Sequence, residues 1–343
     1  MLNTNLDERA SALAAKHVGG ILEVCFEHAP GEPTLVVYDT QSELAALVTE
    51  GYRRARPEAT FLEFNPDDPE SALSAFASLT PGTLVVLVQS TSFRLAKFRI
   101  RMELFRRGFK VIEHPHLSRM QGEEVATYID SLDYDAAYYR GVGRMLRERL
   151  ARTNEAVVDS GNGALLTYPA GFEPAKLNIG DYSELPTVGG QFPIGEVFTE
   201  SLDLEAVSGQ VRIGCFGDTS FQVNRPPSPI TVVIESGRVT GAIDSTPAFD
   251  QVLSEIRAVE GQVWVRELGL GLNRAFSFDR FVTDIGTFER MCGVHLSLGA
   301  KHTTYNKAAI RKKCARFHVD VFAVTEELRL DGEVVYRDGA WRV

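Results

Sequence analysis

Five residues in the second half of this chain have side chains of the types that bind divalent metal ions. They are two glutamates, two histidines and one aspartate: Glu196, Glu267, His295, His318 and Asp320. Carboxylate oxygens and neutral imidazole nitrogens are common protein ligands of zinc, manganese, cobalt and iron. Each of the five stands in a short, distinctive segment, and we take them together as a candidate metal site.

The spacing and surroundings of these residues favour this grouping. His318 and Asp320 are two positions apart in a β-rich segment, so both side chains would project from the same face of a strand. Glu267 and His295 lie among apolar residues and glycines, where burial of an unpaired charge is costly and a cation would be a favourable partner. Pro-Ile-Gly at 193–195 predicts a loop of fixed direction that another segment can approach closely.

A charge count distinguishes two ways of using these side chains. The three carboxylates bring three negative charges, and two divalent ions with one bridging hydroxide sum to zero with them. A single Fe(II) ion needs only a facial triad of two histidines and one carboxylate. A one-ion site would leave two buried carboxylates without a counter-charge. The sequence therefore favours two ions, with one Fe(II) ion as the alternative.

In their order, spacing and amino-acid sequence, these segments resemble the aminopeptidase T family of metallopeptidases, which are thermophilic leucyl-aminopeptidase-like enzymes. The matching segments are Pro-Ile-Gly-Glu-Val-Phe at 193–198, Glu-Leu-Gly-Leu-Gly-Leu-Asn at 267–273, a His-x-x-Leu-Gly segment at 295–299 and His-Val-Asp at 318–320. The resemblance covers residues 155–343 and extends to the first domain only in general layout. It implies that the five residues bind two divalent ions, which would be zinc, cobalt or manganese.

The resemblance also implies an activity. It is that of a metal-dependent hydrolase which cleaves an N-terminal amino acid, or an amino-acid-derived amide, with a metal-activated water. A carboxylate such as Glu267 or Asp320 would be shared by the two ions, which gives Glu267 a catalytic role, and Glu200 is the nearest carboxylate that could act as a spare base. The family has a tyrosine near its metals, for which Tyr305 is the candidate, although residues 301–307 depart from the family pattern. A peptide or small-molecule substrate and a homodimer are implied as well.

Two other functions stay open. Shorter members of the superfamily include ring-opening enzymes similar to 2,5-dihydroxypyridine dioxygenase, which hold one Fe(II) ion with two histidines and one aspartate and act on a hydroxylated nitrogen heterocycle. The length of this chain favours that alternative, whereas Glu267 disfavours it because those relatives have a histidine at this position. A repurposed biosynthetic relative that keeps the fold is the third possibility. The number of bound metal ions distinguishes the first two.

The elements that must position these residues fall into two predicted domains, 1–152 and 153–343. The first alternates β-branched runs with amphipathic stretches, which is typical of an α/β domain with a Rossmann-like layered parallel sheet. Strands are predicted at 34–38, 60–64, 83–88 and 110–113 and helices between them, including 93–107. Neither G-x-G-x-x-G nor a P-loop motif follows these strands, which argues against a nucleotide site. His114 and His116 follow the fourth strand, at the edge where α/β domains bind ligands, and are candidates for substrate contacts.

Residues 123–152 predict one or two helices that link the halves. In the second domain the strands are short and separated by Gly, Pro and Asn, and Glu-Ser-Gly at 235–237 and Leu-Asp-Gly at 330–332 fit hairpin turns. One helix is predicted at 247–258. The second domain is therefore expected to be a mainly antiparallel α+β domain that carries the metal site.

Composition excludes several classes of protein. The 343 residues include 36 lysines and arginines against 46 aspartates and glutamates, a net charge of −10, and 44% are hydrophobic, which is typical of a globular chain. Net acidity argues against a nucleic-acid partner, and the basic residues from Arg94 to Arg107 alternate with apolar ones as on a solvated helix face. No stretch is long and apolar enough for a membrane span, and residues 1–10 lack signal-peptide features, so we expect a cytoplasmic protein without a membrane partner.

Overall fold

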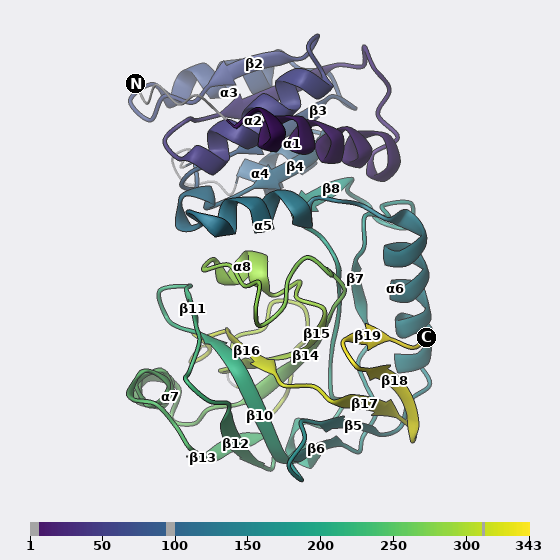
Figure 1. The fold of residues 1–343 in the computed structure, drawn as a ribbon, viewed down its shortest axis with the longest axis vertical. Coiled ribbons are helices and arrows are strands. Elements are labelled where there is room, and N and C mark those ends of the chain that lie inside the picture. Colours follow the sequence, from purple (N-terminus) through teal and green to yellow (C-terminus); the bar gives the residue numbers. More distant parts are fainter. Residues whose placement is uncertain (1–6, 94–99, 311–312) are drawn as a thin grey trace. The chain divides into compact units, whose positions relative to one another are not determined.

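The computed structural model describes residues 7–93, 100–310 and 313–343, and the chain divides into two compact units (Figure 1). One unit comprises residues 1–137 and 180–194, and the other comprises residues 138–179 and 195–343. The chain passes between the units after residues 137, 179 and 194, whereas the prediction had one boundary after residue 152. Helix α6 (Ala136–Leu150) thus lies mainly in the second unit, and strand β8 (Gly189–Gln191) lies in the first.

The first unit is built on a parallel sheet whose strand order is β2-β1-β3-β4-β8. Its first four strands in chain order are β1 (Thr34–Tyr38), β2 (Thr60–Glu63), β3 (Leu84–Val88) and β4 (Lys110–His114). The sequence predicted all four with ends correct to within one residue. The fifth strand, β8, is a Gly-Gly-Gln segment without a strand pattern of its own, and it extends the sheet by pairing with β4.

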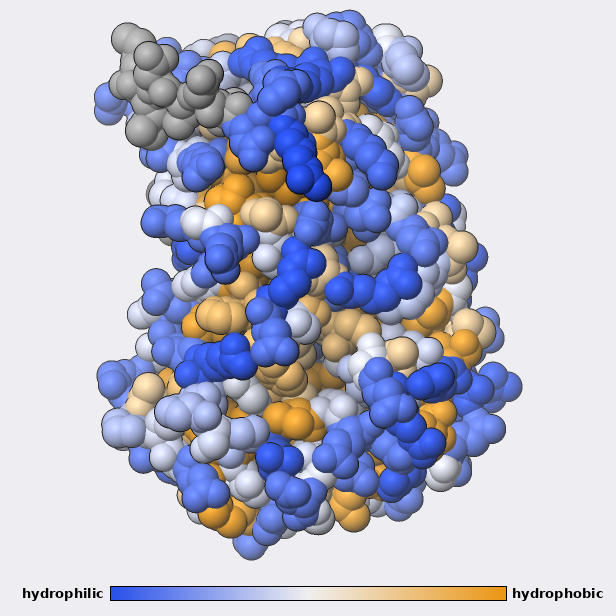
Figure 2. All heavy atoms as spheres, in the orientation of Figure 1, coloured by the Kyte–Doolittle hydropathy of each residue, from blue (hydrophilic) through white to orange (hydrophobic). Residues whose placement is uncertain are grey.

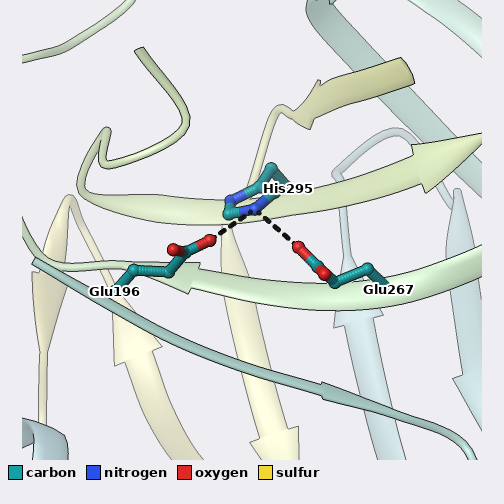
Figure 3. A group of neighbouring side chains, drawn as sticks. All are labelled: Glu196, Glu267 and His295. Atoms are coloured by element: carbon teal, nitrogen blue, oxygen red, sulfur yellow. Dashed lines mark ion pairs between the residues drawn. The ribbon is translucent and has the colours of Figure 1, made fainter. Parts of the chain in front are cut away.

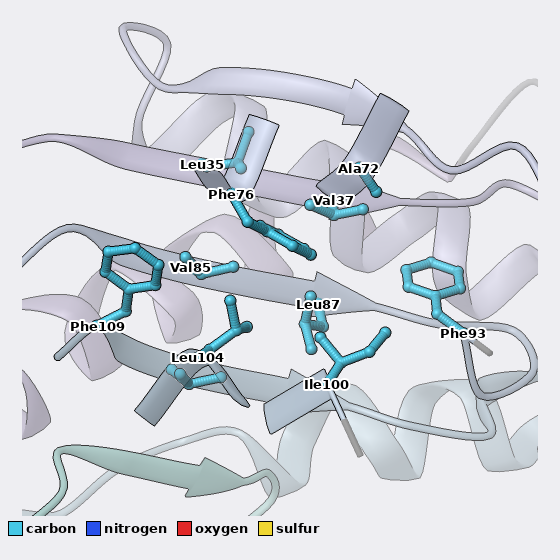
Figure 4. Packing of buried hydrophobic residues seen from close by; sticks show 11 residues of the cluster. Leu35, Val37, Ala72, Phe76, Val85, Leu87, Phe93, Ile100, Leu104 and Phe109 are labelled. Atoms are coloured by element: carbon cyan, nitrogen blue, oxygen red, sulfur yellow. The ribbon is translucent and has the colours of Figure 1, made fainter. Parts of the chain in front are cut away.

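Helices cover both faces of this sheet. They are α1 (Glu8–Gly20), followed by a π-helical turn (Ile21–Cys25), α2 (Glu43–Ala55), α3 (Pro69–Ala77), α4 (Ile100–Arg106), a 3-10 turn (Leu117–Arg119) and α5 (Glu123–Ser131). Alternate strand residues such as Val37, Val85 and Leu87 pack with α3 and α4 in one hydrophobic cluster (Figure 4). Helix α2 contacts β1 and β3 and also packs on α1 and α5. Residues 94–99, the start of the predicted helix and of its basic face, lie outside the described residues.

The second unit is built on an antiparallel sheet of 14 strands within the described ranges, in agreement with the predicted fold class. The longest continuous order is β19-β18-β17-β5-β6-β10-β16-β15-β14-β9-β7, and β11 and the β12–β13 hairpin attach to β10. The strands are β5 (Ala156–Asp159), β6 (Leu165–Tyr168), β7 (Lys176–Asn178), β9 (Glu196–Glu200), β10 (Ser208–Gly217), β11 (Val223–Asn224), β12 (Ile230–Glu235), β13 (Arg238–Ile243), β14 (Val265–Gly271), β15 (Gly293–Leu298), β16 (Val319–Ala323), β17 (Glu327–Leu330), β18 (Glu333–Arg337) and β19 (Ala340–Trp341).

Local sequence signals place the turns and helices of this unit. Ser236 and Gly237 both have positive φ, 49° and 71°, at the tight turn between β12 and β13 that the sequence predicted, a conformation that matches the twist of a hairpin. Helix α7 (Pro247–Glu260) begins where predicted, and Thr246 caps it by accepting a hydrogen bond from the Phe249 backbone N–H. The ring of Phe249 packs on Phe216 of β10 with centroids 5.0 Å apart. Shorter helical pieces are η3 (Leu204–Ala206) and α8 (Ile285–Phe288).

No helix among the described residues is both long enough and apolar enough to cross a membrane. On the face drawn in Figure 2, hydrophilic side chains predominate and hydrophobic ones show as small, separate patches.

His114 is a core residue of the first unit, and its complete burial does not fit the predicted contact with substrate. Its side chain is fully buried, with Nε2 2.9 Å from the Tyr52 hydroxyl and Nδ1 2.8 Å from the Tyr128 hydroxyl. Tyr128 itself donates to the Phe192 carbonyl, so it accepts from His114, which places the proton on Nδ1. Burial lowers the pKa of His114 to about 3. His116 is half-buried, with Nε2 3.2 Å from the Ser92 hydroxyl, and its role in substrate binding stays a prediction.

Acid should destabilise the protein through His114. In the unfolded chain the imidazole titrates near pH 6.5, while in the folded protein its pKa is about 3. The unfolded state therefore binds more protons between these values, and the free energy of unfolding falls as the pH drops, by up to about 1.4 kcal/mol per pH unit for one group. In urea denaturation, His114→Gln should lose this part of the slope, whereas Tyr52→Phe, which leaves the imidazole buried, should keep it. An unchanged slope in His114→Gln would show that His114 is not held neutral.

Candidate functional site

Four neighbouring strands, β16, β15, β14 and β9, bring the predicted metal-binding residues together. In their register Glu196 lies opposite Gly271, and His295 lies opposite Gly269. Residues directly opposite one another on antiparallel strands share a face, as do residues two apart along a strand. The register therefore sets four of the five on one face of the sheet: Glu196, Glu267, His295 and Asp320.

The first group of possible ligands consists of Glu196, Glu267 and His295 (Figure 3). Nε2 of His295 lies 3.3 Å from Oε1 of Glu196 and 3.4 Å from Oε1 of Glu267. All three side chains are buried. One ligand atom from each lies within 4.8 Å of the others, so a single cation could contact all three.

The second group consists of Glu267, His318 and Asp320, and its ligand atoms also lie within 4.8 Å of one another. Nε2 of His318 is 3.2 Å from Oδ1 of Asp320. Nδ1 of His318 lies 3.1 Å from the Lys301 carbonyl oxygen, to which it donates. A histidine that donates from one nitrogen to a backbone carbonyl presents the other as a metal ligand. The His318 side chain is 30% exposed, so this group is the more open one.

Electrostatics shows that these carboxylates need positive charge. Burial alone lowers the pKa of His295, but the carboxylates of Glu196 and Glu267 outweigh it and raise the value to about 10. Burial likewise lowers the pKa of His318, and Asp320 raises it to about 9. For Glu267, burial raises the pKa, whereas the neighbouring imidazoles lower it overall. The raised pKa values favour protonated imidazoles beside these carboxylates, and a divalent cation would supply the positive charge in their place.

Buried polar atoms without hydrogen bonds also lie in these two groups of possible ligands. Both ring nitrogens of His295 and Oδ1 of Asp320 are buried and form no hydrogen bond of acceptable geometry. Buried polar atoms are normally hydrogen-bonded, and each exception calls for a partner such as an ion. Imidazole and carboxylate together form the donor set that zinc and other divalent transition metals prefer. The residues present therefore fit a metal ion.

Two glycines leave the room that this arrangement requires. A Cβ atom added at Gly269 would lie 2.0 Å from Nε2 of His295, so the imidazole lies across β14 only because this residue has no side chain. At Gly195, whose φ is 121°, a Cβ would lie 2.6 Å from a ring carbon of Tyr139 and 3.2 Å from the Asn273 backbone nitrogen. The close approach predicted at Gly195 is thus observed.

Glu200 is not available as the spare base that the sequence suggested. Its carboxylate is completely buried, and both oxygens accept hydrogen bonds from the Arg266 guanidinium, through Nε and, at 3.0 Å, through Nη2. Arg266 also donates to the carbonyls of Ala300 and Tyr305. A carboxylate whose two oxygens both accept hydrogen bonds from one guanidinium has a fixed orientation, and its oxygens already have partners. Glu200 therefore fixes Arg266 and the segment behind it.

Tyr305 does not present its hydroxyl to either ligand group. The hydroxyl donates to the Pro174 carbonyl at 2.8 Å and lies 3.4 Å from the Phe198 carbonyl. Burial raises the pKa of Tyr305, so the phenol stays protonated. Its assignment as a metal ligand does not fit this geometry.

Sequence reasoning did not single out two residues of the site. Nε2 of His302 lies 2.9 Å from Oε2 of Glu267, and the His302 side chain is 3% exposed. Nη1 of Arg290 lies 3.7 Å from Oε2 of Glu196 and also pairs with Glu289. Neither residue belongs to a periodic pattern that would have marked it in the sequence.

An α/β unit with a parallel sheet and a unit with a large antiparallel sheet define a fold that known enzymes share. No model of a known family and no curated protein matches this chain. The structure of 2,5-dihydroxypyridine dioxygenase from Pseudomonas putida KT2440 is similar with a TM-score of 0.62 and 15% identity, covering 96% of this chain and 97% of that chain. Wild-type AmpT from Thermus thermophilus is similar with a TM-score of 0.54 and 14% identity, covering 96% and 99%. The resemblance that the sequence segments predicted is thus confirmed at the level of the fold.

Filling the space beside His295 should weaken metal binding without unfolding the protein. In Gly269→Ala the new methyl group would displace the imidazole, and we expect ~10–100-fold weaker zinc binding, the range typical of disturbing a ligand's orientation. Gly241→Ala is the matched control, because its added Cβ would meet Val233 only at 3.9 Å. Zinc affinity and far-UV circular dichroism would be measured for both variants. Native affinity in Gly269→Ala would show that His295 is not a ligand.

Proposed function

We propose that this protein is a metal-dependent hydrolase with a two-ion site, acting on the amino-terminal end of a peptide or on an amino-acid-derived amide. One observation carries the proposal: two groups of three possible ligands meet in a single shared residue, Glu267. Glu196 and His295 complete one group, and His318 and Asp320 complete the other. Hydrolases with two ions hold them about 3.5–4 Å apart, a distance that the two oxygens of one carboxylate can span.

Charge supports two ions over one. Three ionised carboxylates with neutral imidazoles carry a charge of −3, which a single divalent ion leaves only partly balanced in a buried site. His295 and His318 fall into different groups, so the triad of His295, His318 and Asp320 that a single Fe(II) ion would use is not a compact set here. Bound zinc, cobalt or manganese ions would supply Lewis-acid activation of a water molecule and of the substrate carbonyl.

The protein's own residues determine where that chemistry would take place. The first group is closed by burial of all its members, so water and substrate would have access on the side of the half-buried His318. Its N–H bond to the Lys301 carbonyl keeps the imidazole turned with Nε2 toward Asp320. Arg290 beside Glu196 adds a fixed positive charge at the closed end.

The substrate class rests on the resemblance of the four sequence segments and on the shared fold of AmpT. A free α-amine is a good ligand for one ion of such a pair, which would select the amino-terminal residue of a peptide. We propose a homodimer as the assembled state on the same resemblance.

The second candidate is a ring-cleaving dioxygenase with one Fe(II) ion. It rests on the fold likeness to 2,5-dihydroxypyridine dioxygenase, which covers nearly the whole of both chains. The group of Glu267, His318 and Asp320 would then hold the single ion. That group has two carboxylates and one histidine, the reverse of the facial triad that Fe(II) oxygenases use.

The number of bound ions tests the proposal directly. Titration of the apoprotein with Zn(II) or Co(II), followed by calorimetry and elemental analysis, should saturate at two equivalents per chain. Glu267→Gln removes the shared charge and should lose at least one equivalent together with hydrolysis of amino-acid amides. Glu333→Gln, a glutamate on the surface of β18, should keep both equivalents.

Other outcomes separate the alternatives. Saturation at one equivalent, with iron in anaerobically purified protein and oxygen-dependent loss of heterocycle absorbance, would establish the dioxygenase. A protein that binds no metal and turns over no substrate would instead be a repurposed relative.

A further inference from the structure

The segment between β15 and β16 contacts one residue in each ligand group. Lys301 accepts the Nδ1–H hydrogen bond of His318 through its carbonyl at 3.1 Å. The next residue, His302, reaches Oε2 of Glu267 with Nε2 at 2.9 Å. Two consecutive residues thus touch both halves of the candidate site, although the sequence here departs from the segments that identified it.

Hydrogen bonds to the backbone determine which nitrogen of His302 carries the proton. Nδ1 of His302 accepts from the backbone N–H of Thr304 at 3.1 Å and of Tyr305 at 3.3 Å. A ring nitrogen that accepts hydrogen bonds is unprotonated, so the proton of the neutral imidazole is on Nε2. Nε2 therefore donates to Glu267.

The same geometry excludes His302 as a metal ligand. Coordination through Nε2 would require loss of its proton while Nδ1 is also unprotonated, which leaves an imidazolate anion in a buried site beside a carboxylate. His318 has the opposite arrangement: its Nδ1–H is used by a carbonyl, which leaves Nε2, 3.2 Å from Oδ1 of Asp320, as the nitrogen that can bind an ion. The structure therefore gives the two histidines different tasks, although both lie beside the carboxylates.

We propose that His302 is a positioning residue that holds Glu267 in the orientation needed to bridge two ions. Its Nε2–H bond fixes Oε2 of Glu267, while Oε1 faces His295 at 3.4 Å. A carboxylate oxygen has two lone pairs, so Oε2 keeps one for an ion held by His318 and Asp320. This inference rests on the proposed function, because it assigns the bridge on which a two-ion site depends.

Strong anchors hold His302 in place. The Tyr305 ring packs 5.0 Å from the His302 ring between centroids, and the Tyr305 hydroxyl donates to the Pro174 carbonyl. The Lys307 ammonium donates to the Glu173 carboxylate and to the Ser201 carbonyl, both at 2.6 Å. Because hydrogen bonds hold both ends of residues 301–307, the His302 imidazole loses little conformational entropy when it orients Glu267.

Two substitutions separate positioning from the other roles of a histidine. His302→Phe keeps the ring and removes the donor, and we expect ~10–100-fold weaker Co(II) binding, as for loss of an orienting partner, with a changed visible spectrum of the bound cobalt. His302→Gln places an amide N–H near the former Nε2 and should restore affinity and spectrum to near those of wild type. Far-UV circular dichroism of both variants would verify that they fold, and ¹⁵N NMR should show the Nε2–H tautomer of His302 in metal-loaded protein.

Each other result overturns the inference. If both variants lose cobalt equally and the spectrum shows loss of a nitrogen ligand, His302 is itself a ligand. If His302→Phe binds cobalt as wild type does and His302→Gln does not, the ring only packs. The unmodified protein reports separately on the proposed function: failure of wild type to bind cobalt at all would overturn both, whereas saturation at one equivalent with a weakened His302→Phe would overturn only the two-ion site and the bridge.

Discussion

Three buried carboxylates on one face of one sheet, two of which each share a group of possible ligands with Glu267, are the constraint on which the second unit depends. Glu196, Glu267 and Asp320 would repel strongly in a medium of low dielectric constant if nothing compensated them. The compensation is visible in the raised pKa values of His295 and His318 and in the guanidinium of Arg290 beside Glu196. A protein gains no stability from such a cluster by itself. Such a cluster is consistent with the cation site that we propose.

The sheet meets the geometric part of this requirement. Ligands that are far apart in the chain, such as Glu196 and His295, come close together because β9, β14, β15 and β16 follow one another in the sheet. Strand residues are held more firmly than loop residues, which favours an accurate ligand arrangement. A side chain at Gly269 would obstruct the arrangement, because its Cβ would lie 2.0 Å from Nε2 of His295. His318 stands just before β16, and its loop position is offset by the hydrogen bond to Lys301.

Short sequence patterns correctly predicted the structural features that depend on neighbouring residues in the chain. The parallel strands, the turn at Ser236 and Gly237 and the start of α7 follow from β-branched runs, turn chemistry and a capping threonine. Helix α1 and strand β8 were missed, the latter because Gly189 and Gly190 have no strand propensity and pair only through contact with β4. The five possible ligands were predicted from residue type and from the resemblance of their segments to a known family, whereas the partners of these side chains depend on tertiary contacts. Arg266, which donates hydrogen bonds to the Glu200 carboxylate, is 66 positions from Glu200 in the sequence. His302 is 35 positions from Glu267.

The repeated passage of the chain between the units affects how the protein can be divided. Strand β8 completes the parallel sheet beside β4, yet it lies beyond α6 and β7 in sequence. A fragment ending at residue 137 or 152 would therefore lack its last strand and expose β4 as an unpaired sheet edge, which is prone to aggregation. A single cut in the chain cannot separate the two units, because the chain passes between them three times. A chimaera that exchanges one unit must therefore transfer two separate stretches of sequence.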